Sequence, residues 1–218
     1  MREHVLSGHI GEVGYVRASW LRRAGIPRTA GGLQPGVLWD LGSHLVDLVL
    51  WITRWRPPFT VASLALDVSR GQAGASAAWH GEYDPEACAA PACDTAVLAF
   101  QADHGCGATV EVSWSCGVPR DQVEILVCGD RGALRLSTAF GFTPDRDALR
   151  GDALTVAQQH GEWRGVGIAH EPRYAEYNKQ LAEMIAVIRG DASTPQERGP
   201  IVESTEMVAG TAPELRTP

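Results

Sequence analysis

The chain has 218 residues, of which 44% are hydrophobic and 21% charged, the composition of an ordinary globular domain. Its net charge of −7 argues against a nucleic-acid surface, and five cysteines without metal-type pair spacing argue against a disulfide framework or a metal site. There is no signal-type apolar segment, and the longest apolar run is broken by Asp47 and too short to span a bilayer. We therefore expect a cytoplasmic protein that binds neither membrane, metal nor nucleic acid.

The first half of the chain predicts a helix fragment, one strand and one long helix. Residues 1–7 read as the helix fragment, and 13–20 as a strand because they are rich in β-branched and aromatic side chains. A loop rich in Gly and Pro follows over 21–35. The stretch WDLGSHLVDLVLWITRW, over 39–55, has the apolar periodicity of a helix docked on a sheet, and Pro57 and Pro58 are expected to end it.

The second half predicts hairpins and a second helix. Strands are expected over 59–67, 94–101, 107–115, 122–128 and 133–137, with weaker ones over 153–158 and 162–166 and an exposed loop over 69–92. The consecutive hairpins indicate a mostly antiparallel sheet. Residues 174–189 predict a helix whose apolar stripe is formed by Tyr174, Tyr177, Leu181, Met184 and Ile188. The fold class is thus α+β, an open and mostly antiparallel sheet with both long helices packed on one face.

The helix over 39–55 carries the candidate chemistry. At 100° per residue, Asp40, His44, Asp47 and Trp51 fall on one stripe, and a carboxylate one turn before a His can fix the ring's tautomer and raise its basicity. The same pair also fits a solvated ion pair, and Asp40 also fits an N-cap. Just upstream, Arg22 and Arg23 fit either a site for a carboxylate or phosphate or an ordinary arginine-rich surface.

The amino-acid sequence of this stretch also indicates a family resemblance. GVLWDLGSHLVDLVLWI resembles the Asp-x-Gly-x-His signature of the Gfo/Idh/MocA oxidoreductases. GHIGEVGYVRASW, DTAVLAFQADHGCGATVEVSW and VEILVCGDRGALRLS extend the resemblance in the family's order. It implies one substrate-binding and oligomerisation-type domain over 1–218, with 1–7 a remnant of the helix linking it to an upstream Rossmann domain that this chain lacks, and 210–218 a tail. Asp40 and His44 then take the places of the family's Asp and His beside the substrate hydroxyl.

The resemblance also implies a cofactor that the sequence has no motif to bind. NAD or NADP is expected from the family, yet no GxGxxG turn and no Glu-Lys-Pro motif occurs, and Lys179 is in the wrong context to replace that lysine. No cofactor-binding residue is therefore predicted. The nicotinamide half is expected from a separate cofactor-domain chain or to be lost by truncation.

Three functions follow as hypotheses. The first is the substrate domain of an NAD(P)-dependent oxidoreductase acting on a sugar, polyol or related alcohol. Here His44 and Asp40 are catalytic, Arg22 and Asp47 bind the substrate, and copies associate into a homo-oligomer through the sheet face. The second is a stand-alone lyase, dehydratase, isomerase or cyclase that reuses Asp40 and His44 without a cofactor. The third is a non-catalytic assembly module.

Overall fold

The computed structural model describes residues 1–23, 36–68, 93–140, 153–167, 175–191, 204 and 206–209. The predictions for most of the 21–35 loop, for the 69–92 loop, for Tyr174 and for the 210–218 tail lie outside these residues. None of the helices in the described ranges is long and apolar enough to cross a membrane.

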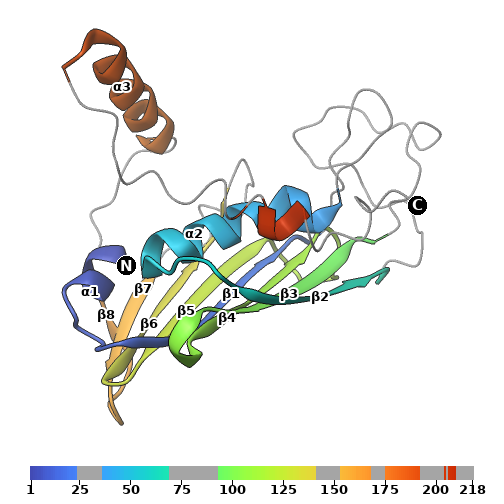
Figure 1. The fold of residues 1–218 in the computed structure, drawn as a ribbon, viewed down its shortest axis with the longest axis horizontal. Helices are drawn as coiled ribbons and strands as arrows, with labels where there is room; N and C mark the ends of the chain where they lie inside the picture. The colour runs from blue at the N-terminus through green and yellow to red at the C-terminus, as the bar shows by residue number, and fades with distance from the viewer. Residues whose placement is uncertain are drawn as a thin grey trace.

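One twisted eight-stranded sheet forms the body of the molecule (Figure 1). Its strands are β1 (Val13–Leu21), β2 (Thr60–Leu66), β3 (Thr95–Gln101), β4 (Gly107–Ser113), β5 (Gln122–Gly129), β6 (Gly132–Thr138), β7 (Leu154–Gln158) and β8 (Arg164–Gly165). They lie in the order β2-β3-β4-β1-β5-β6-β7-β8. Among the described strands, only β1 and β4 pair in parallel, with Leu21 opposite Ser113, and the other pairs are antiparallel. The predicted open, mostly antiparallel sheet is therefore confirmed.

The predicted strand alternation decides which face of the sheet is covered. In β4, Ala108, Val110 and Val112 point to the core and are at most 3% exposed, whereas Glu111 on the opposite face is exposed. Val16 of β1 and Ile125 of β5 point to the same side as Val110, with no exposure. This apolar side of the sheet is the surface on which a helix can dock.

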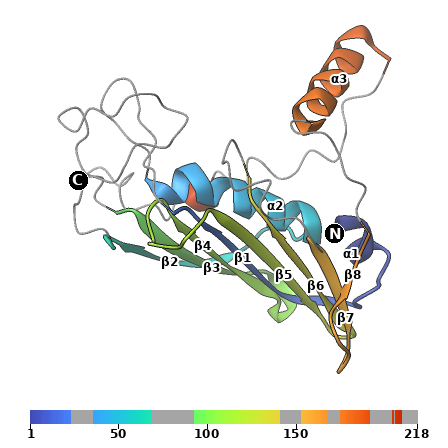
Figure 2. The same cartoon turned by 180° about the vertical axis from the view of Figure 1, so that it is seen from behind.

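The helix that docks there is the predicted one, and its first turn is wider than an α-helical turn. A π-helical turn, Leu38–Gly42, runs directly into α2 (Ser43–Thr53). Figures 1 and 2 show α2 lying along one face of the sheet, beside the short helical segment at 206–209. Leu45, Val49 and Ile52 are at most 2% exposed, so the stripe expected for docking is the one that docks.

The C-terminal end of this helix is fixed by two hydrogen bonds to its last carbonyls. Arg54 takes the left-handed conformation (φ 60°) and its N–H donates to the carbonyl of Leu50 at 2.8 Å, so α2 ends before the two prolines predicted to stop it. The short helix α1 (Arg2–Leu6) reaches the same end, where Arg2 Nε donates to the carbonyl of Trp51 at 3.0 Å. The helix fragment expected at the N-terminus is therefore packed against α2.

The second predicted helix, α3 (Ala175–Arg189), forms but does not lie on the sheet. It stands away from the body in Figures 1 and 2. Its apolar residues are exposed: Tyr177 42%, Leu181 51%, Met184 50%, Ile185 37% and Ile188 76%. The expectation that this helix also covers the sheet is wrong, because an apolar stripe predicts a helix without saying what the stripe contacts.

Candidate functional site

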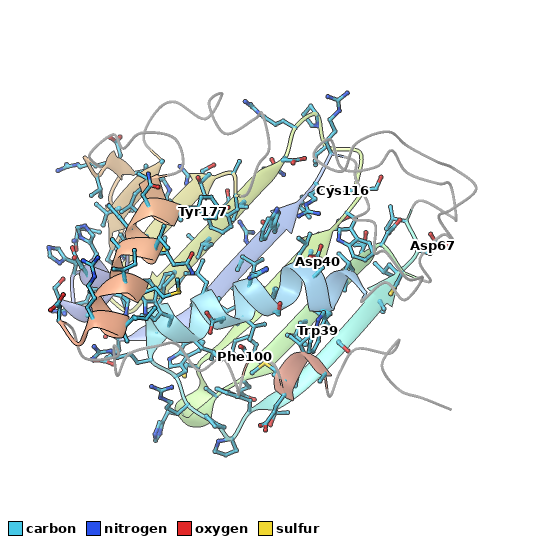
Figure 3. All side chains as sticks on the ribbon, turned by 90° about the horizontal axis from the view of Figure 1, so that it is seen from above. Trp39, Asp40, Asp67, Phe100, Cys116 and Tyr177 are labelled. Atoms are coloured by element: carbon cyan, nitrogen blue, oxygen red, sulfur yellow. The ribbon has the colours of Figure 1, made fainter. Side chains whose placement is uncertain are left out.

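The candidate site lies where the parallel strands β1 and β4 end, beneath the first turn of α2. Parallel strands bring their carboxyl ends to the same edge, here with Leu21 opposite Ser113. The pairing continues one residue further, since the N–H of Arg22 donates to the carbonyl of Ser113 at 2.9 Å. Figure 3 looks down on the helix and places Asp40 and Trp39 at this end.

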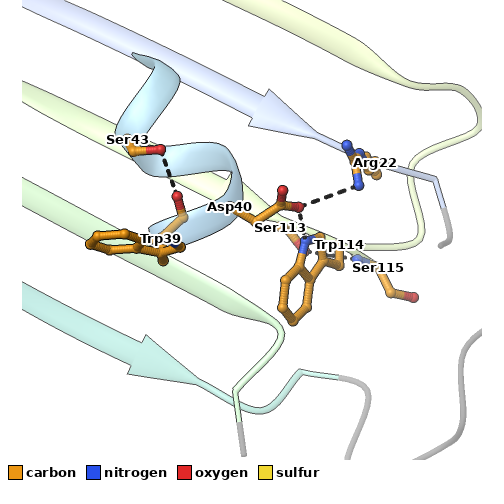
Figure 4. A network of polar contacts seen from close by, with 7 residues as sticks. All are labelled: Arg22, Trp39, Asp40, Ser43, Ser113, Trp114 and Ser115. Carbon is orange, nitrogen blue, oxygen red and sulfur yellow. Dashed lines mark hydrogen bonds and ion pairs between the residues drawn. The ribbon is translucent and has the colours of Figure 1, made fainter. Parts of the chain in front are cut away.

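Asp40 is held by two side chains from the strand ends (Figure 4). Its Oδ2 accepts a 2.8 Å hydrogen bond from Trp114 Nε1, and the Arg22 guanidinium forms an ion pair with the same oxygen at 3.7 Å. Trp114 has no exposure and Arg22 only 8%. Burial lowers the pKa of Arg22, while the carboxylates of Asp40 and Asp121 act to raise it. Asp40 therefore ties the start of α2 to both strands.

A buried hydroxyl network fixes the strand end that carries Trp114. The backbone N–H of Trp114 donates to the carbonyl of Asp94 at 2.9 Å. Thr95 and Ser113 share a 2.8 Å hydroxyl–hydroxyl hydrogen bond, and Ser113 Oγ also accepts from the N–H of Ser115 at 3.2 Å. Because these groups are satisfied by one another, the indole is directed at Asp40 by rigid neighbours.

His44 is exposed and is not paired with Asp40. Its ring lies 6.2 Å, centroid to centroid, from that of Trp20, and Trp20 in turn makes an edge contact with Phe140 at 5.4 Å. Within the described residues, Asp40 and His44 share no hydrogen bond or ion pair. The prediction placed them together on a regular helix, whereas the π-helical turn inserts extra backbone before His44 and changes the angular spacing.

Asp47 lies three residues after His44 on α2. It is half-buried on α2, and its Oδ1 is buried with no hydrogen-bond partner. Burial raises the pKa of Asp47, and the positive charge of His44 acts in the opposite direction. The two carboxylates thus differ: Asp40 is bonded to Trp114 and Arg22, whereas Asp47 has a buried oxygen without a hydrogen bond.

A separate pocket lies at the other end of α2. It has a volume of about 860 Å³ and is lined by α1, the residues after α2 and the β3–β4 turn, including Arg54, Arg56 and His104. None of the predicted site residues lines it. Arg23 is exposed, and its backbone N–H donates to Asp121 Oδ1 at 2.8 Å. The structure therefore brings together Arg22, Asp40 and Trp114, with His44 and Asp47 further along the helix.

Comparison with known proteins identifies the family. The sequence profile described as the GFO/IDH/MocA C-terminal domain matches residues 1–135, more than half of the chain. This chain belongs to the GFO/IDH/MocA C-terminal domain family.

Relatives of this GFO/IDH/MocA domain are longer proteins. A protein of Amycolatopsis mediterranei (strain S699), assigned as the oxidoreductase subunit of UDP-kanosamine synthase, is 28% identical over 95% of this chain and 59% of its own length. The chain thus spans less than two thirds of that relative.

Solved structures share the fold of the GFO/IDH/MocA domain. An oxidoreductase domain protein from Kribbella flavida matches with a TM-score of 0.70 and 18% identity, over 98% of this chain and 60% of its own. Levoglucosan dehydrogenase in complex with NADH and L-sorbose matches with a TM-score of 0.64 and 15% identity, over 98% and 58%. At these identities the likeness concerns the fold.

The described part of this GFO/IDH/MocA domain does not fit a dinucleotide. A pyrophosphate is usually held by a Gly-rich turn between a parallel strand and a helix N-terminus. The one parallel pair among the described strands, β1 and β4, is not joined by a single strand–helix–strand connection, because β2 and β3 intervene in the chain. Nor do the described residues contain a group of three or more His, Cys, Asp or Glu that could hold a metal ion.

Sequence reasoning missed the two tryptophans of the site. The strand patterns over 107–115 and 13–20 include Trp114 and Trp20 and assign neither of them to the site. The available signal was chemical: a buried indole N–H usually finds a hydrogen-bond acceptor. This rule predicts that a buried Trp114 needs an acceptor, and the fold supplies it by bringing the indole to Asp40.

Proposed function

We propose that this chain is the substrate domain of an NAD(P)-dependent oxidoreductase acting on a sugar, polyol or related alcohol. The observation that carries the proposal is the exposed His44, placed at the strand-end edge on a helix whose first turn is anchored by Asp40. Family membership supports the reaction class, and the relative assigned to UDP-kanosamine synthase supports a sugar-like substrate.

In this proposal His44 is the general acid–base group. When the alcohol is oxidised, its O–H bond breaks and the proton passes to a ring nitrogen of His44; in the reverse direction the ring returns it. The hydride acceptor belongs to the cofactor, which other residues or another chain would supply. Asp40 acts by holding the start of α2, through Trp114 and Arg22.

The substrate-binding assignments for Arg22 and Asp47 stay predictions. Arg22 is 8% exposed and already forms an ion pair with Asp40, so we propose that it holds the Asp40 carboxylate in position. Asp47 is half-buried beside His44, where it can face a bound hydroxyl. Each assignment is tested by the loss of sugar binding on substitution.

The uncovered sheet face is the proposed homo-oligomer surface. It carries exposed Tyr15 and Leu64, together with the ion pair between Arg17 and Glu124 at 2.7 Å. A mixed apolar and polar face of this kind is typical of protein–protein contacts. Light scattering of the chain, with Leu64→Glu as the disrupting variant, tests the assignment.

Calorimetry tests the proposed function. The purified chain is titrated with UDP-glucose, and separately with NADH and NADPH. We expect saturable heat with the sugar nucleotide that is weakened by His44→Ala, and none with either cofactor. Saturable NADH binding would overturn the placement of the cofactor site outside this chain. Turnover of a sugar without any nicotinamide would instead favour the lyase or isomerase class.

A further inference from the structure

Asp47 is an unusual group on a helix that is otherwise well satisfied. Its Oδ1 is buried and receives no hydrogen bond. An unsatisfied buried oxygen costs free energy, and a hydrophobic or amide side chain would avoid much of that cost. Burial also raises the pKa of Asp47, so the surroundings disfavour the ionised carboxylate. A carboxylate kept at such a position is a candidate functional group.

The proposed acid–base residue closest to Asp47 in the sequence is His44. Three residues separate them, so both side chains project from the same side of α2. The charge of His44 stabilises the ionised carboxylate, as the opposing direction of its effect on the pKa of Asp47 indicates. Arg22 and Asp40, which also lie at this end of α2, form an ion pair at 3.7 Å, and Asp121 acts on Arg22 as well.

The alternative partner of His44 is already engaged. Asp40 Oδ2 accepts the indole N–H of Trp114 at 2.8 Å and faces the Arg22 guanidinium. Moving this oxygen towards His44 would leave a fully buried indole N–H without its acceptor. Asp40 Oδ2 is therefore held as an anchor by Trp114 and Arg22.

We propose that Asp47 is the positioning carboxylate of His44. It stabilises the imidazolium that forms when His44 holds a proton and orients the ring, while Asp40 anchors the helix on which both residues lie. The inference rests on the proposed acid–base role of His44. The different roles of Asp40 and Asp47 are inferred from the contacts described above.

The first test measures the reactivity of the His44 ring. Diethyl pyrocarbonate acylates the neutral imidazole, and mass spectrometry follows His44 separately from the other histidines. At pH 6, Asp47→Asn should accelerate acylation of His44 severalfold, because losing the carboxylate favours the neutral ring. Asp47→Glu should restore the slower rate, and Glu111→Gln, which removes an exposed charge from the opposite sheet face, should not change it. An equal rate in Asp47→Asn and the unaltered protein would overturn the proposal.

The second test reads the same coupling from the carboxylate. Carbon-13 NMR follows the Asp47 carboxyl with pH in the unaltered chain, in His44→Gln and in His104→Gln. His44→Gln should raise the pKa of Asp47 further, because the cationic ring that lowers it is lost; His104→Gln should not. Identical curves in all three proteins would contradict the proposal. Neither test needs a substrate, so a failure to bind sugar would count against the proposed function alone.

Discussion

The two long helices of this protein have similar apolar stripes and opposite surroundings. In α2 the stripe is buried against the sheet, with Leu45 and Val49 fully covered. In α3 the corresponding residues Leu181 and Ile188 are 51% and 76% exposed. Helical periodicity is thus the same signal in both cases, and its consequence for stability differs.

The difference concerns how much each helix contributes to the folding energy. Apolar area removed from water is the main favourable term in folding, so α2 contributes to the free energy of unfolding and α3 contributes little. Groups that need exact placement also depend on a rigid support. Accordingly, Asp40, His44 and Asp47 all lie on the buried helix or its first turn.

The largest effect is expected at Leu45. Leu45→Ala leaves a cavity between α2 and the sheet and should lower the free energy of unfolding by about 3 kcal/mol. Urea denaturation followed by far-UV circular dichroism measures it. A loss below about 1 kcal/mol would mean that α2 is not closely packed on the sheet.

Removal of the indole hydrogen bond should have the next largest effect. Trp114→Phe keeps most of the packing but leaves Asp40 Oδ2 without its donor, which should cost about 2 kcal/mol. Trp163→Phe is the matched control, since Trp163 is 41% exposed. Equal stability of the two variants in urea would show that the bond to Asp40 contributes nothing.

Asp47→Asn should stabilise the fold in a pH-dependent way. The folded-state pKa of Asp47 lies above its ordinary value of 3.8, so the folded protein holds this proton more tightly than the unfolded chain. Stability from the group is therefore full below pH 3.8 and declines as pH rises through the folded-state pKa. The variant should have a higher Tm than the unaltered protein at pH 7, and the gain should shrink towards pH 3.8. A constant Tm difference across this range would contradict the shift.

The smallest effect on stability is expected at Leu181 of α3. Leu181→Ala should change the free energy of unfolding by less than about 0.5 kcal/mol, because the side chain is half exposed already. The same urea experiment as for Leu45 measures it. A loss approaching that of Leu45→Ala would show that α3 packs on the body in solution.

Most of the architecture followed from local patterns, and the site followed only in part. The alternation in residues 107–113 and the stripe through Leu45 and Val49 each fix one apolar face, which is enough to predict a sheet with a docked helix. The partner of Asp40 could not be predicted from a regular helical spacing, because the π-helical turn at 38–42 and the packing of Trp114 are tertiary outcomes. For the same reason, the pattern in α3 gave no information about its contacts.

The most direct test of the proposed strand-end site is to locate the sugar nucleotide on the protein. Amide NMR spectra of the isotope-labelled chain are recorded during titration with UDP-glucose. We expect perturbations confined to 20–22, 40–47 and 113–116, at the strand-end site, and weaker perturbations in His44→Gln. Perturbations around Arg54, Arg56 and His104 would place the ligand in the pocket at the other end of α2 and contradict the proposed strand-end site.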